Sequence, residues 1–146
     1  MERPRVLFLC TGNSARSILA EALLRHHAHD RVESYSAGLD PIGVREETLT
    51  ALEEVGIDTS GLESTSVEEY LGNVHFSYLI TVCSDAEEDC PRVWPGVNER
   101  IHWPVADPAL VEGDGRMDAF RAARDELDAR IRAWLAEESL GDGATP

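Results

Sequence analysis

Residues 6–17 of the chain read VLFLCTGNSARS, and this stretch decides the fold. Its first four residues form a continuous apolar run, which is typical of a strand buried on both faces of a sheet. Residues 10–17 are small and polar and predict a loop. Apolar side chains then recur at helical spacing, so this loop is expected to lead into a helix over about residues 17–27.

The rest of the chain alternates between predicted strands and helices. Further strands are expected over residues 32–36, 78–82 and 100–103. Further helices are expected around Leu49, Leu52 and Val55, over residues 66–71 with Ser66 as its cap, and over about 115–138. Strands separated by helices predict the α/β class, with a parallel sheet and right-handed crossovers.

Length and charge exclude several classes of protein. The 146 residues favour one domain, expected over residues 1–138 and followed by a flexible polar tail over 139–146. The net charge of −15 and the lack of a basic patch argue against nucleic-acid binding. No apolar run approaches the roughly 20 residues that span a bilayer. A cytoplasmic, monomeric protein without a membrane partner is expected.

The loop over residues 10–17 has the pattern C-x5-R-S at a strand-to-helix turn. Successive backbone N–H groups in such a turn form an anion site, to which the helix N-terminus adds positive potential. Arg16 is suited to grip two oxygens of a tetrahedral oxyanion. Cys10 is expected below the anion as a thiolate nucleophile, with Ser17 hydrogen-bonded to its sulfur. A buried structural cysteine before an ordinary helix is the alternative.

Residues 10–17, the Ser36-Ala37-Gly38 segment and the Asp107-Pro108 pair together resemble the low-molecular-weight protein tyrosine phosphatase superfamily. The resemblance implies a four-stranded parallel sheet with helices on both faces. It implies that Asp107 protonates the leaving oxygen and that Asn13 supports the loop, with Ser36 nearby. The residues expected to surround the anion are Thr11, Gly12, Asn13, Ser14, Ala15, Arg16 and Ser17.

Two further cysteines, Cys83 and Cys90, distinguish between branches of this superfamily. Cys83 follows a predicted strand and is therefore expected at the same sheet edge as Cys10. The three thiols, His102-Trp103 and the segment FRAARDEL at residues 120–127 resemble the thioredoxin-coupled arsenate reductases. Phosphatases of the superfamily typically have an aromatic residue where this chain has Ala109, and a second loop cysteine where it has Ala15.

This second resemblance implies a thiol relay that reduces arsenate to arsenite. Cys10 attacks arsenic, Cys83 then attacks Cys10, and Cys90 finally attacks Cys83. Thioredoxin is the implied reductant of the last disulfide. The alternatives are a phosphatase acting on phosphotyrosine or small phosphoesters, which needs only Cys10, Arg16 and Asp107, and a non-catalytic oxyanion-binding domain.

Metal binding is not expected to be required. Some related reductases hold a potassium ion with residues that match Asn13, Glu21 and Ser36, and with an acidic residue after a Thr-Ser pair. Here Val67 follows that pair, so one ligand is missing. His26, His27 and His29 lack partners at metal-binding spacing and are expected to be solvated at a helix end.

Overall fold

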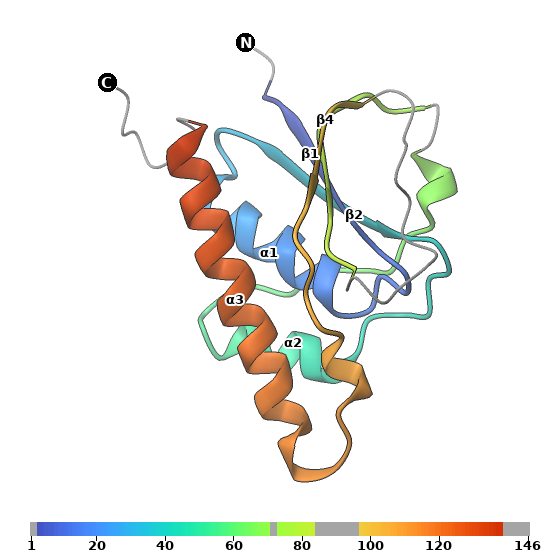
Figure 1. The fold of residues 1–146 in the computed structure, drawn as a ribbon, viewed down its shortest axis with the longest axis vertical. Helices are drawn as coiled ribbons and strands as arrows, with labels where there is room; N and C mark the ends of the chain where they lie inside the picture. Colours follow the sequence, from blue (N-terminus) through green and yellow to red (C-terminus); the bar gives the residue numbers. More distant parts are fainter. Residues whose placement is uncertain (1–2, 71–72, 84–96, 139–146) are drawn as a thin grey trace.

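The computed structural model describes residues 3–70, 73–83 and 97–138 (Figure 1). Its four strands form one parallel sheet in the order β2-β1-β3-β4. Their bounds are Arg5–Cys10 for β1, Glu33–Gly38 for β2, Phe76–Thr81 for β3 and Val97–His102 for β4. The α/β class and the four-stranded parallel sheet are thereby confirmed.

In the part of the chain that the structure describes, three α-helices accompany the sheet, namely α1 (Arg16–Ala28), α2 (Glu46–Glu53) and α3 (Arg116–Glu137). The connections in these described ranges also contain three short 3-10 turns, namely η1 (Val67–Glu69), η2 (Pro108–Leu110) and η3 (Gly113–Gly115). Within the described residues, no helix is long and apolar enough to cross a membrane.

Strand β1 is central, which explains its unbroken apolar run. It pairs with β2 along one edge and with β3 along the other. Both its faces are covered as well, since Val6 and Phe8 are buried in the main core on one face and Leu7 and Leu9 in a second cluster on the other. In the register, Cys10 lies opposite Gly38, and Leu9 lies opposite Thr81. The carboxyl ends of these three strands therefore meet at one edge, where ligands bind in open α/β sheets.

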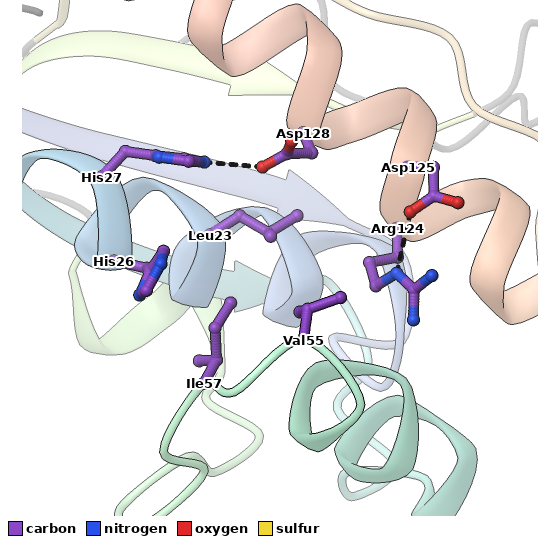
Figure 2. A pocket seen from close by; sticks show the side chains of 8 residues that line it. All are labelled: Leu23, His26, His27, Val55, Ile57, Arg124, Asp125 and Asp128. Atoms are coloured by element: carbon purple, nitrogen blue, oxygen red, sulfur yellow. Dashed lines mark hydrogen bonds and ion pairs between the residues drawn. The ribbon is translucent and has the colours of Figure 1, made fainter.

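Helices α1, α2 and α3 share one face of the sheet (Figure 1). The predicted stripe of Phe120, Leu127, Ile131 and Trp134 on α3 is buried in the main core, as expected. His27 of α1 is not simply solvated, because its Nε2 lies 2.6 Å from Asp128 Oδ1 of α3. Figure 2 shows this pair beside a surface pocket at the junction of the helices.

The opposite face of the sheet is covered differently. Leu7, Leu9 and Leu79 pack there against Val67 of η1, with three aromatic rings, those of Tyr35, Tyr70 and Phe76, in edge-to-face contacts. The family resemblance implies helices on both faces. Within the described residues, this face carries only a 3-10 turn.

Two details of the predicted helices were wrong. Val55 was expected on the buried stripe of the second helix, but α2 ends at Glu53 and Val55 is 46% exposed. The expected helix over residues 66–71 is a single 3-10 turn within its described part. Ser66 does cap this turn, since its hydroxyl accepts a hydrogen bond from the Glu68 amide. The predicted tail over residues 139–146 lies outside the described residues.

Candidate functional site

The loop after β1 is anchored through its carbonyl groups. The carbonyls of Cys10, Thr11, Gly12 and Ser14 accept hydrogen bonds from the amides of Leu39, Asp40, Ile42 and Arg45, at 2.9–3.3 Å. In a trans peptide the N–H and C=O groups point in opposite directions. Since these carbonyls point outward to the segment after β2, the N–H groups that follow them face the inside of the loop, as an anion site requires.

Asn13 holds the loop in a curled conformation. Its φ of 45° lies in the left-handed region, which is uncommon for a residue with a Cβ. The buried side-chain amide donates to Ser17 Oγ at 2.7 Å and to Ser36 Oγ at 3.1 Å, and its Oδ1 accepts from the Thr65 amide at 2.6 Å. Three tertiary contacts thus stabilise a backbone conformation that would otherwise be unfavourable.

Gly38 allows the loop to approach β2 closely. A Cβ at this position would lie 2.8 Å from Asn13 Cβ, Asn13 N and Thr11 O. Two of these are backbone atoms of the loop itself, so they could not yield without distorting it. In the sequence, Gly38 is part of the Ser36-Ala37-Gly38 segment that carries the family resemblance. The structure supplies the steric reason for a glycine at this position.

Arg16 opens α1 and is 4% exposed. Its Nη1 donates to the carbonyls of Val105 at 3.0 Å and Val82 at 3.4 Å, so the ends of β3 and β4 orient the guanidinium. The residue before it, Ala15, provides no side-chain cap for the helix N-terminus. The helix therefore directs both the positive end of its dipole and an arginine toward the loop.

Cys10 ends β1 at this positive region and is 2% exposed. Its Sγ lies 2.8 Å from Ser17 Oγ, the contact expected from the sequence. Ser17 Oγ also accepts a hydrogen bond from the side-chain amide of Asn13 at 2.7 Å. The Cys10 sulfur therefore lies beside the Ser17 hydroxyl in the first turn of α1.

Asp107 lies across the site from the loop. Its Oδ2 is 3.6 Å from Arg16 Nη2, and its Oδ1 accepts a hydrogen bond from the Ala109 amide at 2.9 Å. The side chain is 27% exposed, so solvent reaches it. The structure brings together Asp107 and Arg16 although 90 residues separate them in the chain.

Cys83 lies two residues beyond β3 and is completely buried. Its Sγ is 3.9 Å from the carbonyl oxygen of Leu9, and the Val82 amide donates to that same oxygen at 2.9 Å. Cys83 is therefore held beside the residue that precedes Cys10, at the expected sheet edge. Cys90 lies outside the described residues.

Glu21 connects the loop support to the helix surface. Its Oε1 accepts a 2.5 Å hydrogen bond from Ser36, and its Oε2 pairs with Arg25 at 2.6 Å. Burial raises the pKa of Glu21 above its ordinary value, although Ser36 and Arg25 oppose this shift.

The polar groups of this cluster contact one another and Arg25. The charge of its one carboxylate is already paired with Arg25, and Asn13 directs its amide nitrogen, not its oxygen, to Ser36. Among the described residues, no group of three or more His, Cys, Asp or Glu is arranged to hold a metal.

Sequence reasoning missed several supports of the site. Ser64 donates to the Asn13 carbonyl at 2.6 Å, and Thr48 donates to the Ser14 carbonyl at 2.8 Å. Both residues lie more than 30 positions from the loop, and neither belongs to a recognisable motif. Glu21 was considered only as a metal ligand, not as the acceptor for Ser36.

Comparisons with known proteins agree with this architecture. The low molecular weight phosphotyrosine protein phosphatase family matches residues 5–142. An arsenate reductase of Shouchella clausii is 40% identical over 137 residues, which cover 92% of this chain and 96% of that protein.

Solved structures give the same result. An arsenate reductase in its phosphate-binding state superposes with a TM-score of 0.77 at 27% identity, covering 92% of this chain and 98% of that one. A thioredoxin-dependent arsenate reductase of Corynebacterium glutamicum gives 0.69 at 29% identity, covering 94% and 63%.

The fold and the loop after β1 thus define a phosphatase-like α/β protein. The chain belongs to the low-molecular-weight phosphotyrosine phosphatase family, and its similar relatives include arsenate reductases.

Proposed function

We propose that this protein is an arsenate reductase that uses three cysteines in succession. The observation that carries the proposal is that two thiols lie at the same edge of the sheet. Cys10 lies at the base of the anion loop, and Cys83 is held beside Leu9 on the neighbouring strand end. Phosphoester hydrolysis needs one thiol, whereas reduction of As(V) to As(III) needs two electrons, which two thiols supply when they form a disulfide.

In the first step the Cys10 thiolate attacks arsenic and forms a sulfur–arsenic bond. A hydroxyl group of arsenate accepts a proton from Asp107 and leaves as water as its arsenic–oxygen bond breaks. Arg16 and the inward-facing N–H groups of the loop stabilise the negative charge on the remaining oxygens. The 3.6 Å separation of Asp107 from Arg16 supports this assignment, because it brings the acid to the oxyanion that Arg16 binds.

In the second step Cys83, as a thiolate, attacks the Cys10 sulfur. The sulfur–arsenic electron pair passes to arsenic, which departs as arsenite, and a Cys10–Cys83 disulfide forms. Cys90 then attacks Cys83, which releases Cys10 as a thiolate and leaves a Cys83–Cys90 disulfide. A dithiol protein of the thioredoxin type reduces this last bond in the cytoplasm. The thioredoxin dependence of the Corynebacterium glutamicum relative supports that choice of reductant.

No resident metal or cofactor takes part in this reaction. The cluster of Asn13, Glu21 and Ser36 supports the loop through hydrogen bonds, and Arg25 supplies the positive charge that balances Glu21. We therefore expect the rate to be the same in potassium and sodium salts at equal ionic strength.

A single-turnover experiment tests the relay. Fully reduced protein is mixed with arsenate, quenched with an alkylating agent and mapped for disulfides by mass spectrometry. We expect a Cys83–Cys90 disulfide in the unmodified protein and a trapped Cys10–Cys83 disulfide in Cys90→Ser. Inorganic phosphate in place of arsenate and the Cys10→Ser variant are the controls, and neither should produce a disulfide.

Phosphotyrosine or small-phosphoester hydrolysis is the second candidate, because the family carries that activity in its name. Hydrolysis depends on Cys10, Arg16 and Asp107 and tolerates Cys83→Ser. If all three thiols remain reduced after arsenate and an aryl phosphate is hydrolysed, the protein is a phosphatase. If neither reaction occurs but phosphate binds, it is a non-catalytic oxyanion-binding domain.

A further inference from the structure

The loop that carries Asp107 is fastened by a residue outside the anion site. Arg116, the first residue of α3, donates from Nη1 to the Ala109 carbonyl at 2.8 Å and to the Val111 carbonyl at 3.3 Å. Its Nε donates to Glu47 Oε2 at 2.6 Å. One guanidinium thus joins the acid loop to the start of α2.

The other end of this connection reaches the anion loop. Glu47 lies in the first turn of α2, whose flanking Arg45 amide donates to the Ser14 carbonyl at 3.1 Å. The Thr48 hydroxyl donates to the same carbonyl at 2.8 Å. Hydrogen bonds and one short helical turn therefore lead without a break from Ser14 to Arg116.

The connection ends on the carboxylate of Asp107. Ala109 is held on both sides, since its carbonyl accepts from Arg116 and its amide donates to Asp107 Oδ1 at 2.9 Å. A shift of residue 109 would therefore move the carboxylate. The second oxygen, Oδ2, is the one that faces Arg16.

Arg116 occupies an unfavourable place for a cation. The helix dipole favours acidic side chains in the first turn of a helix and disfavours basic ones. Specific contacts must therefore offset this cost. Arg116 makes three hydrogen bonds, and its guanidinium carbon also lies 5.5 Å from the centre of the Phe120 ring. The Arg116 hydrogen bond also lowers the pKa of Glu47, which keeps that carboxylate charged.

We propose that the Arg116–Glu47 pair is a positioning device that sets the Asp107 carboxylate against the anion loop. This inference rests on the proposed role of Asp107 as the proton donor. Arg116 is a positioning residue and does not touch the anion. The planar fork of arginine reaches two carbonyls and one carboxylate at once, which the single ammonium of lysine cannot do.

The chain offers a matched control. Arg121 of α3 pairs with Glu54 at the end of α2, with Nη2 and Oε2 2.8 Å apart. This contact also joins α3 to α2, but Arg121 makes no hydrogen bond or ion pair with residues 107–111. Glu54 retains Arg124 as a partner when Arg121 is removed. Arg121→Ala therefore removes a helix–helix ion pair and leaves the acid loop fastened.

The test is a double-mutant cycle on the single-turnover reduction of arsenate. We expect Arg116→Ala to lower the rate constant at saturating arsenate by about tenfold, since small misplacements of a reacting group cost up to about 100-fold. Inorganic phosphate affinity should change by less than about threefold, because Arg116 does not face the anion. Arg116→Lys should restore little of the rate, and Arg121→Ala should remain within about twofold of the unmodified protein.

The decisive comparison uses Asp107→Asn. If Arg116 acts through Asp107, adding Arg116→Ala to Asp107→Asn causes no further loss of rate. An equal loss in both backgrounds overturns the proposal. A normal rate in Asp107→Asn also overturns it, while leaving the reductase assignment intact.

A readout independent of activity covers the case in which arsenate is not reduced at all. Amide hydrogen exchange at residues 107–111 should rise in Arg116→Ala and not in Arg121→Ala, because only the first variant releases the loop. Such a rise would support the positioning device even if the proposed function failed. Unchanged exchange in Arg116→Ala would overturn it.

Discussion

At the scale of single residues, the geometry of the site depends on the residues that hold the loop in its conformation. Cys10 and Arg16 are the residues proposed to attack and to bind the anion. Asn13, Gly38 and Glu21 support the conformation of the loop between them. Asn13 is tied by three side-chain hydrogen bonds, and Gly38 leaves the space in which Asn13 lies. Substitutions at these supports are therefore expected to affect both stability and anion binding.

Gly38→Ala should destabilise the protein by about 2 kcal/mol, because the new Cβ would overlap loop backbone atoms at 2.8 Å. Urea unfolding followed by circular dichroism measures this change, and phosphate affinity should fall with it. Gly115→Ala is the matched control, since the nearest atom to its Cβ is 3.9 Å away. Equal stability of the two variants would contradict the steric argument.

Glu21→Gln tests the buried carboxylate. Burial raises the folded pKa of Glu21 above its ordinary value of 4.5, so the folded state binds a proton that the unfolded state has released. The wild-type protein therefore loses stability from this group as the pH rises from about 4.5 through the raised pKa. Glutamine does not titrate, so the free energy of unfolding of the variant, relative to wild type, should increase over that window. A difference independent of pH would argue against the raised pKa.

At the scale of elements, α3 contributes to both the core and the site. Helix α3 lies beside α1 (Figure 1), and its apolar stripe is buried in the main core together with residues of α1. Its first residue, Arg116, hydrogen-bonds to the acid loop. The His27–Asp128 contact adds a polar link between α1 and α3 (Figure 2). Loss of packing along α3 should therefore destabilise the main core, in which the helices pack on the sheet.

Leu127→Ala should cost roughly 2–5 kcal/mol, because Leu127 is completely buried and its removal leaves a cavity in the main core. Thermal or urea unfolding gives the value. Leu110→Ala removes the same atoms from a side chain that is 80% exposed and should change stability by less than about 0.5 kcal/mol. Comparable effects of the two substitutions would refute the packing described for α3.

At the scale of the whole molecule, a net charge of −15 opposes the approach of an anionic substrate. The attraction comes from a small region, where Arg16 and the α1 N-terminus meet the loop. Long-range repulsion between separated charges is screened by salt, whereas a nearly buried arginine close to its anion is screened much less.

Arsenate should therefore associate faster as inert salt is raised from about 0.01 M to about 0.15 M, where the Debye length falls from about 30 Å to about 8 Å. Stopped-flow measurement of the first step at limiting arsenate, with choline chloride as the salt, would show this change. A rate that falls with salt would mean that attraction to the region around Arg16, and not repulsion by the net charge, governs the approach of arsenate. The same series on Arg16→Ala gives the response without the contribution of this arginine to the attraction.

The sequence by itself determined the features that lie within short segments. The apolar run before the C-x5-R-S loop predicted a buried strand that leads through a loop into a helix, and the structure has these elements at almost the predicted residues. The order of strands and helices predicted a parallel sheet, because short connections and right-handed crossovers leave few arrangements. The resemblance of a few motifs named the family correctly.

Only the tertiary structure decided which distant residues meet. The approach of Asp107 to Arg16, the contact of Cys83 with Leu9 and the fastening of residue 109 by Arg116 each join segments that no local pattern connects. Propensity and periodicity describe neighbours along the chain, whereas these contacts depend on how strand ends and helix ends are brought together by core packing. The same reason explains why His27 was expected to be solvated: its partner Asp128 is 101 residues away.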